Sequence, residues 1–164
     1  MPNNLILNTG KVVELKNISA TPATTITLNN TTTTVTLGTL TLDLQNINNK
    51  VLLSGAIGFR FNAAVGGVAL TLPGSLLLTI KSNGNDVYKA RLGEVGLITG
   101  INLGYIGYNT LGFEWMDDPI TTSICNSTVV YDFILTVENI GVTETVTLVS
   151  GQDYYSLTAS EIQQ

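Results

Sequence analysis

The chain has 164 residues, which is enough for one domain that buries its own hydrophobic core. Only 12% of its residues are charged, about half the usual share, and seven Lys plus Arg against twelve Asp plus Glu give a net charge of −5. Because the chain has no His and one Cys, it cannot build by itself a Ser-His-Asp triad, a Cys-His dyad, a His-containing zinc site or a CxxC redox pair. The few basic residues are scattered, so we expect no nucleic-acid surface.

The first residues have neither the basic nor the apolar segment of a secretory signal. The longest apolar stretches, over 51–61 and 75–80, are much shorter than the roughly 18 residues that cross a bilayer, so we expect no membrane insertion. We predict that residues 1–28 form an arm that pairs with the body of the domain or with a neighbouring subunit, with an ordinary edge strand as the alternative. The candidate inter-subunit contacts of this arm are apolar: Leu5, Ile6, Leu7, Val12, Val13, Leu15 and Ile18.

Alternating apolar residues predict the first strands of the main domain, which we place at residues 29–164. Over 33–45 the alternation slips by one residue near Gly38, and a β-bulge there absorbs the slip. Over 51–61 one face carries most of the large apolar residues and the other carries Leu52, three smaller residues and Arg60, which predicts a long strand.

A hairpin is predicted over 75–91, because Asn83-Gly84 suits the two positive-φ positions of a type I′ turn between two alternating runs. The glycine-punctuated stretch 97–108 predicts a bent strand or a corner. Over 129–138 every second residue is apolar, a turn at 139–141 leads into a partner strand over 142–149, and a terminal strand, expected to be internal, covers 154–162.

These patterns amount to eight to ten short strands with turns between them and no crossover helix. We therefore predict an all-β fold, an antiparallel β-sandwich of the jelly-roll type with an N-terminal strand-like arm.

The acidic cluster over 113–119 is the one candidate ligand site. Three carboxylates in a loop beside an aromatic ring have the chemistry to hold calcium or to stack on a sugar, as lectin-like modules do. The alternative is a common turn with a core tryptophan, and no calcium-loop spacing is present, so we expect no metal and no cofactor. The residues of this candidate loop are Glu114, Trp115, Asp117 and Asp118.

Other chemistries find little support in the sequence. A glycosidase needs two carboxyl groups about 5–10 Å apart across a cleft, and Asp132 and Glu138 on one predicted strand are about 20 Å apart. Cys125 is a candidate for an inter-subunit disulfide, although a buried free thiol is the commoner fate. No phosphate-binding glycine loop precedes a helix. We therefore expect no catalytic residues.

The surface points to assembly instead. Strands rich in Thr, Asn, Ser and Gly carry few of the charged side chains that prevent an edge strand from pairing with another chain. In addition, Leu52 and Leu77 put large apolar side chains on the second face of their strands. We expect a homo-oligomer, as a trimer, a ring or a polymer.

The order of runs over 50–61, 76–84, 142–149 and 154–162 resembles the trimeric TNF-like jelly roll at the C-terminus of collagen-like spore-surface proteins of bacilli and clostridia. The resemblance covers residues 40–164, but there is no Gly-X-Y collagen tract. The arm is similar to the strand-donating arms of jelly-roll subunits in spore appendage fibres. These likenesses imply deposition from the cytoplasm without a signal peptide.

We therefore predict a non-enzymatic, self-assembling structural protein of a bacterial spore coat, exosporium or appendage. The alternatives are a phage virion protein, such as a capsid decoration or fibre subunit, and a carbohydrate-binding module centred on Trp115. A hydrolase is the third possibility.

Overall fold

The computed structural model describes residues 11–46, 48–63, 75–92, 105–119, 128–139 and 144–163. Ten strands and no helix occur in this part of the chain. The strands are β1 (Lys11–Ala20), β2 (Ile26–Leu28), β3 (Thr34–Asp43), β4 (Lys50–Ala63), β5 (Ser75–Ser82), β6 (Asn85–Leu92), β7 (Tyr105–Asp117), β8 (Thr128–Glu138), β9 (Glu144–Leu148) and β10 (Tyr155–Gln163). Within the described residues there is accordingly no helix of the length and apolarity that a bilayer crossing requires.

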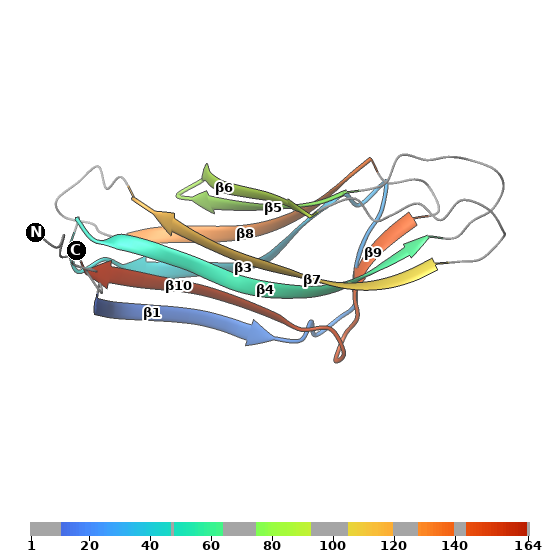
Figure 1. Ribbon diagram of the computed structural model, residues 1–164, viewed down its shortest axis with the longest axis horizontal. Coiled ribbons are helices and arrows are strands. Elements are labelled where there is room, and N and C mark those ends of the chain that lie inside the picture. Colours follow the sequence, from blue (N-terminus) through green and yellow to red (C-terminus); the bar gives the residue numbers. More distant parts are fainter. Residues whose placement is uncertain are drawn as a thin grey trace, which may run out of the picture.

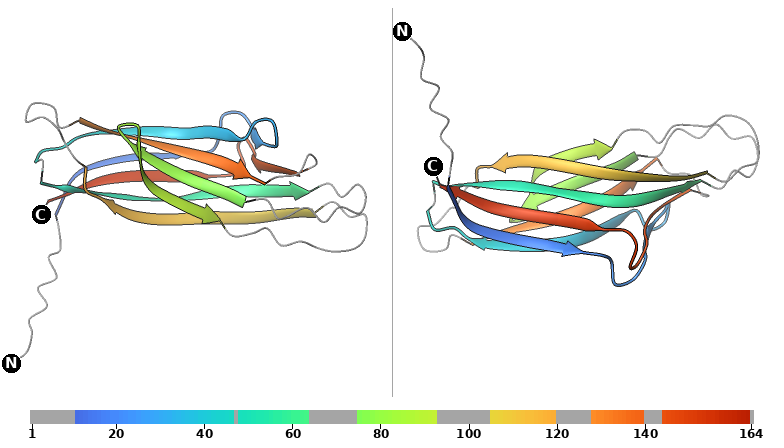
Figure 2. Two further views of the ribbon diagram at one scale, coloured as in Figure 1. Left: turned by 90° about the horizontal axis from the view of Figure 1, so that it is seen from above. Right: turned by 60° about the horizontal axis from the view of Figure 1, so that its bottom comes forward.

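The strands form two antiparallel sheets that pack face to face (Figure 1). The first, which we call sheet A, has the strand order β1-β10-β4-β7, extended by β9 and β2, because β9 pairs with the last residues of β4. The second, sheet B, has the order β3-β8-β5-β6. This interleaved order is the jelly-roll arrangement, so the predicted fold class is confirmed. Figure 2 shows β1, β10, β4 and β7 side by side in one layer.

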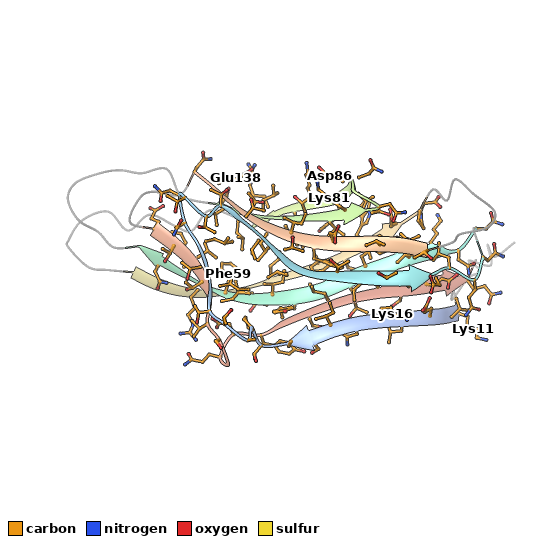
Figure 3. All side chains as sticks on the ribbon, turned by 180° about the vertical axis from the view of Figure 1, so that it is seen from behind. Lys11, Lys16, Phe59, Lys81, Asp86 and Glu138 are labelled. Atoms are coloured by element: carbon orange, nitrogen blue, oxygen red, sulfur yellow. The ribbon has the colours of Figure 1, made fainter. Side chains whose placement is uncertain are left out.

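The core lies between the sheets and consists of the inward half of each alternating run. On β8 the side chains of Val129, Tyr131, Phe133, Leu135 and Val137 are all buried, as the alternation predicts. On β4 the buried residues are Val51, Leu53, Ile57, Phe59 and Phe61, again the predicted set. Figure 3 labels Phe59 within this interior. Burial of these apolar faces is the main stabilising contribution, at about 25 cal/mol per Å² removed from water.

Two local predictions depended on single glycines, and both are confirmed. The register of β3 against β8 shifts between Thr36 and Gly38, which is the predicted bulge. The turn between β5 and β6 has Asn83 at φ 47° and Gly84 at φ 84°, the two positive values that a type I′ hairpin needs. The C-terminal strand β10 is internal, between β1 and β4, as predicted. The predicted pairing of 142–149 with 129–138 is wrong: β8 pairs with β3 and β5 in sheet B, whereas β9 pairs with β2 and β4 in sheet A. The alternation identified both strands, but it does not say which sheet a strand joins.

A fully buried carboxylate ties the end of β10 to the connection between β3 and β4. Glu161 is 0% exposed, and its Oε1 atom accepts hydrogen bonds from the Gln45 amide at 2.8 Å and from Asn49 Nδ2 at 2.7 Å. The Asn46 amide approaches the same atom at 3.4 Å. These contacts satisfy backbone and amide groups that would otherwise be buried without partners, so Glu161 serves as a structural anchor for this end of the sandwich.

Candidate assembly face

On each strand of sheet A, alternate side chains point into the core, and the remaining side chains point outward. On β4 these are Leu52, Ser54, Ala56 and Gly58, which alternate with the buried residues. The strand register aligns them in rows with outward residues of β10 and β7, because directly opposed residues share a face of the sheet. We call this surface the A face.

One end of the A face is mostly apolar. Two adjacent rows bring together the apolar side chains of Val12, Ile162, Leu15, Leu52 and Met116 from four strands, with Lys50 and Ser160 in the same rows. Three of them are unusually exposed for apolar side chains: Val12 at 51%, Leu15 at 59% and Met116 at 45%. A contiguous exposed group of this kind marks an interaction surface more often than a solvated one.

The middle of the A face is flat and bears small side chains. Its two central rows contain Thr158, Ser54, Ser156, Ala56 and Gly112, and the exposed Glu114 on β7 stands at the margin of one of these rows. A Cβ atom built on Gly112 would meet no other atom within 4 Å, so this position opens onto free space. Short side chains let a second surface approach closely, and their hydroxyl groups can exchange hydrogen bonds with it.

The far end of the A face is hollowed. Because β10 and β9 pair with successive parts of the same edge of β4, the chain between them leaves the sheet as a turn over 149–154. Between this turn and the sheet is an open depression of about 430 Å³, lined by Ala56, Gly58, Phe59, Thr110, Gln152, Asp153 and Tyr154.

Hydrogen bonds hold the wall of this depression in place. The Gly58 amide donates to the Tyr154 carbonyl at 2.8 Å, and the Val149 amide donates to Asp153 Oδ2 at 2.6 Å. The Arg60 guanidinium forms an ion pair with Asp153 at 3.1 Å and donates to Gln152 Oε1 at 2.6 Å. The depression is therefore a fixed feature of the A face, with the half-exposed Tyr154 ring at its rim.

The outward face of sheet B is chemically different. It carries seven charged side chains, namely Asp43, Lys81, Asp86, Lys89, Arg91, Asp132 and Glu138. Figure 3 shows Glu138, Lys81 and Asp86 at the outer side of this sheet. Most take part in local contacts, such as the Arg91–Glu138 ion pair at 2.6 Å and the Lys89–Asp86 pair at 2.7 Å. A face with paired, hydrated charges is suited to solvent, so the two outer surfaces of the sandwich are not equivalent.

The residues predicted as a ligand loop lie instead on strand β7. Alternation along that strand turns Glu114 outward and Asp117 inward, so their carboxylates point to opposite faces of the sheet. Asp117 is 7% exposed and accepts a hydrogen bond from the Tyr131 hydroxyl at 2.8 Å, and burial raises the pKa of its carboxyl group. Asp118 follows the strand and is exposed. The described residues contain no group of three His, Cys, Asp or Glu side chains arranged for a metal ion.

Trp115 lies at the open margin of the sandwich. Its ring is 43% exposed and lies 5.5 Å from the ring of Tyr88 on β6, measured between centroids. Tyr88 in turn lies 6.3 Å from Phe113, which contacts the core through Phe133. An aromatic row thus extends from the core to the surface where β6 of one sheet passes β7 of the other.

The residues predicted for the arm divide into two groups. Leu5, Ile6 and Leu7 lie outside the described residues, as does Cys125. The segment from Val12 to Ile18 belongs to β1, which pairs with β10 of the same chain. Exchange of this arm between subunits stays a prediction.

The sequence pattern did not reveal the contribution of Met116 and Tyr154 to the A face. Their exposure follows from the register of β7 and from the turn before β10, and neither shows in the alternation of a single strand.

Comparisons with known proteins give distant structural likenesses. No protein-family model and no curated protein matches the chain. The VP2 subviral particle of infectious bursal disease virus matches at 13% identity and a TM-score of 0.41, over 92% of this chain and 38% of that chain. The T13 viral particle of the same virus matches at 15% identity and a TM-score of 0.43, over 94% and 36% of the two chains. Dimeric latent PorU from Porphyromonas gingivalis matches at 8% identity and a TM-score of 0.33, over 94% and 14%. The chain thus spans less than two fifths of the length of these two viral chains.

Proposed function

We propose that this chain is a non-enzymatic structural subunit that assembles with copies of itself through the A face and forms part of a particle surface. The observation that supports this proposal is the contrast between the two outer faces. Among the described residues, four of the five exposed large hydrophobic side chains belong to the A face, namely Val12, Leu15, Met116 and Tyr154. The strands of the A face carry three outward charged side chains, Lys50, Arg60 and Glu114, whereas the outer face of sheet B carries seven.

The A face has the dimensions of a subunit contact. Four strands about 4.8 Å apart and about nine residues long cover roughly 19 Å by 30 Å, or roughly 570 Å² in projection. The accessible area of a surface exceeds its projection, so the face is comparable with the roughly 800 Å² that each partner buries in a standard interface. Met116 and Tyr154, which lie toward its two ends, are of residue types that interfaces contain more often than the rest of a protein surface does.

The proposed particle is a bacterial spore coat, exosporium or appendage, with a phage virion as the alternative. We propose a trimer or a ring as the assembled form, because closed symmetric oligomers are the usual outcome of self-association. Immunogold labelling of intact spores and of virions from the source organism distinguishes the two particles.

A pair of variants tests assembly through the A face. Leu15→Arg places a charge on the apolar end, and because Leu15 is 59% exposed the substitution leaves the core intact. Thr41→Arg is the control, since Thr41 is an exposed residue on the outer face of sheet B. We expect light scattering to give a multiple of the 17.4 kDa subunit mass for the wild type and for Thr41→Arg, and a smaller mass for Leu15→Arg.

Two outcomes contradict the proposal. One is a wild-type protein that stays at the single-chain mass at high concentration, and the other is an assembly that Leu15→Arg leaves unchanged. Unchanged far-ultraviolet circular dichroism of both variants ensures that a loss of mass reports on the contact and not on unfolding.

A carbohydrate-binding role is the second candidate, and the exposed Trp115 ring beside Tyr88 favours it. An aromatic ring offers a stacking platform for the apolar face of a sugar. A glycan array probed with the wild type and with Trp115→Ala, with and without calcium, tests this role. Binding that disappears in Trp115→Ala supports it.

A further inference from the structure

The free edges of the two sheets differ in how well they are protected from pairing with another strand. Unpaired backbone N–H and C=O groups along an edge are a template for a further strand, and proteins block them with bulges and with charged side chains, especially Lys. Sheet A has free edges at β1, β7 and the strand β2, which at three residues is too short to template much pairing, and sheet B has free edges at β3 and β6.

Three of these edges carry such protection. The register of β1 shifts between Val12 and Glu14, and Lys16 on the same strand forms an ion pair with Glu14 at 2.9 Å. The bulge near Gly38 interrupts β3. A register shift marks the β5–β6 ladder as well, and β6 carries Asp86, Lys89 and Arg91.

Strand β7 has none of these features. All thirteen of its residues, Tyr105–Asp117, pair with β4 in a continuous register without a shift. The strand contains no Lys, Arg or Pro, and its only described pairing partner is β4. Trp115 and Met116 are 43% and 45% exposed near its end. A long, regular edge with exposed apolar side chains and little charge is what a strand-pairing site needs.

We infer that β7 pairs antiparallel with β7 of a second copy of this chain, across a two-fold axis normal to sheet A. The A face is a different surface, so this contact adds to the proposed function and does not depend on it. The pairing joins two copies of sheet A into one continuous sheet and satisfies free backbone groups along the paired part of both edges.

The charges on β7 favour one register. A pairing centred on Glu114 would set two carboxylates directly opposite each other, which is destabilising. A pairing centred on Phe113 instead places Glu114 beside Gly112 of the second copy and Trp115 beside Leu111 of the second copy. This register gives Glu114 of each copy a small neighbour, sets Asp117 opposite the uncharged Asn109 and gives each indole ring an aliphatic neighbour, so the strand is complementary to itself.

Two independent contacts on one subunit have a consequence for the assembly. A chain that uses only the A face or only the β7 edge stops at one closed oligomer, whereas a chain that uses both can build extended sheets or filaments. The edge contact therefore supplies the route from small oligomer to continuous surface layer.

Hydrogen exchange measured by mass spectrometry tests the edge contact on the full chain. Peptides that cover 105–117 and 85–92 are compared at low and high protein concentration. We expect exchange over 105–117 to slow at least about tenfold at high concentration, because an unpaired edge amide becomes hydrogen-bonded, while the protected edge over 85–92 stays unchanged. Equal exchange over 105–117 at both concentrations, under conditions where light scattering shows association, overturns the inference.

Variants separate the edge contact from the A-face contact. Trp115→Lys introduces the usual protecting charge on β7, and Asn85→Lys is the matched control on β6, where residue 85 is exposed. In the Leu15→Arg background we expect a residual dimer that Trp115→Lys abolishes and that Asn85→Lys keeps. A Leu15→Arg dimer that survives Trp115→Lys with its fold intact refutes β7 pairing, whereas an unchanged Leu15→Arg assembly refutes the A-face contact.

An added extended peptide tests the other possible occupant of the edge. A peptide with the sequence of residues 105–117 should compete with β7 of the second copy and lower the mass of the Leu15→Arg dimer. If foreign strand-forming peptides of unrelated sequence bind equally well and the chain alone shows no protection over 105–117, the edge serves another partner and the inference is wrong.

Discussion

Gly55 and Gly112 occupy neighbouring strands of sheet A, and replacing each by Ala should change stability in opposite directions. Gly55 faces inward in the middle of β4, opposite Phe113. A Cβ atom at Gly55 would collide with the carbonyl oxygen of Ser156 and would lie 2.7 Å from Cε1 and Cζ of the Phe113 ring. Gly112 faces outward on β7, and a Cβ atom there would contact nothing within 4 Å.

The expected stability changes depend on whether the atoms next to the added methyl group can move away from it. The Ser156 carbonyl belongs to the backbone of β10, and the Phe113 ring is packed 5.9 Å from Phe133, so neither can give way cheaply. Overpacking of this kind costs typically 1–3 kcal/mol, and we expect Gly55→Ala to lie at the upper end, at about 3 kcal/mol. For a chain of this size that corresponds to a drop of about 6–12 °C in Tm. Gly112→Ala restricts only the unfolded chain and should stabilise by up to about 1 kcal/mol.

Urea denaturation followed by circular dichroism, at concentrations where the chain is monomeric, measures both values. The slope of unfolding free energy against urea should be the same for the wild type and the two variants, which shows that the comparison reports stability alone. If Gly55→Ala unfolds within about 0.5 kcal/mol of the wild type, or if Gly112→Ala is destabilised as much as Gly55→Ala, the assignment of inward and outward faces in sheet A is wrong.

Substitutions at three further residues test buried groups. Burial raises the pKa of Asp117 above its ordinary 3.8, so the folded state favours the neutral carboxyl group. The free energy of unfolding should therefore fall as pH rises from 3.8 through the raised pKa. Urea titrations between about pH 3 and pH 7 measure this fall, and Asp117→Asn should remove it. Glu161→Ala leaves the Asn49 side chain without its acceptor and should cost about 2–4 kcal/mol, whereas Glu161→Gln keeps the acceptor and should cost less in the same assay. Leu42→Ala opens a cavity at a side chain that is 0% exposed and should lower the free energy of unfolding by about 2–5 kcal/mol; a loss under about 1 kcal/mol contradicts its place in the core.

The position of the acidic cluster shows where a sequence pattern is insufficient. Glu114 to Asp118 has the composition of a loop, but the four residues from Glu114 to Asp117 continue the long strand β7, which pairs with β4 along its whole length. Pairing with β4 decided the structure here. The end of this edge strand accommodates two carboxylates, because Glu114 faces solvent and Asp117 accepts a hydrogen bond from the buried Tyr131 hydroxyl.

The buried role of Glu161 could not be predicted from the sequence either. In the alternation of β10 the residue lies in the inward phase, as Leu157 and Ala159 do, yet its type suggests exposure. What makes its burial possible is the connection between β3 and β4, which presents the Gln45 amide and the Asn49 side chain as donors. Partners of this kind come from residues more than a hundred positions away, so no local rule identifies them.

Local chemistry was sufficient for most of the strands, for the turn between β5 and β6 and for the fold class, but not for the full length of β7 or for the pairing partners of β9. Alternation with period two, the positive φ angles that Asn83-Gly84 supports and the slip at Gly38 depend on neighbouring residues only, and a sequence carries that information by itself. Only the tertiary structure decided which outward faces became the A face, where Met116 and Tyr154 are exposed and which edge of a sheet stayed unprotected. The reason is physical: strand order and register join residues far apart in the chain, and a surface exists only after that pairing is complete.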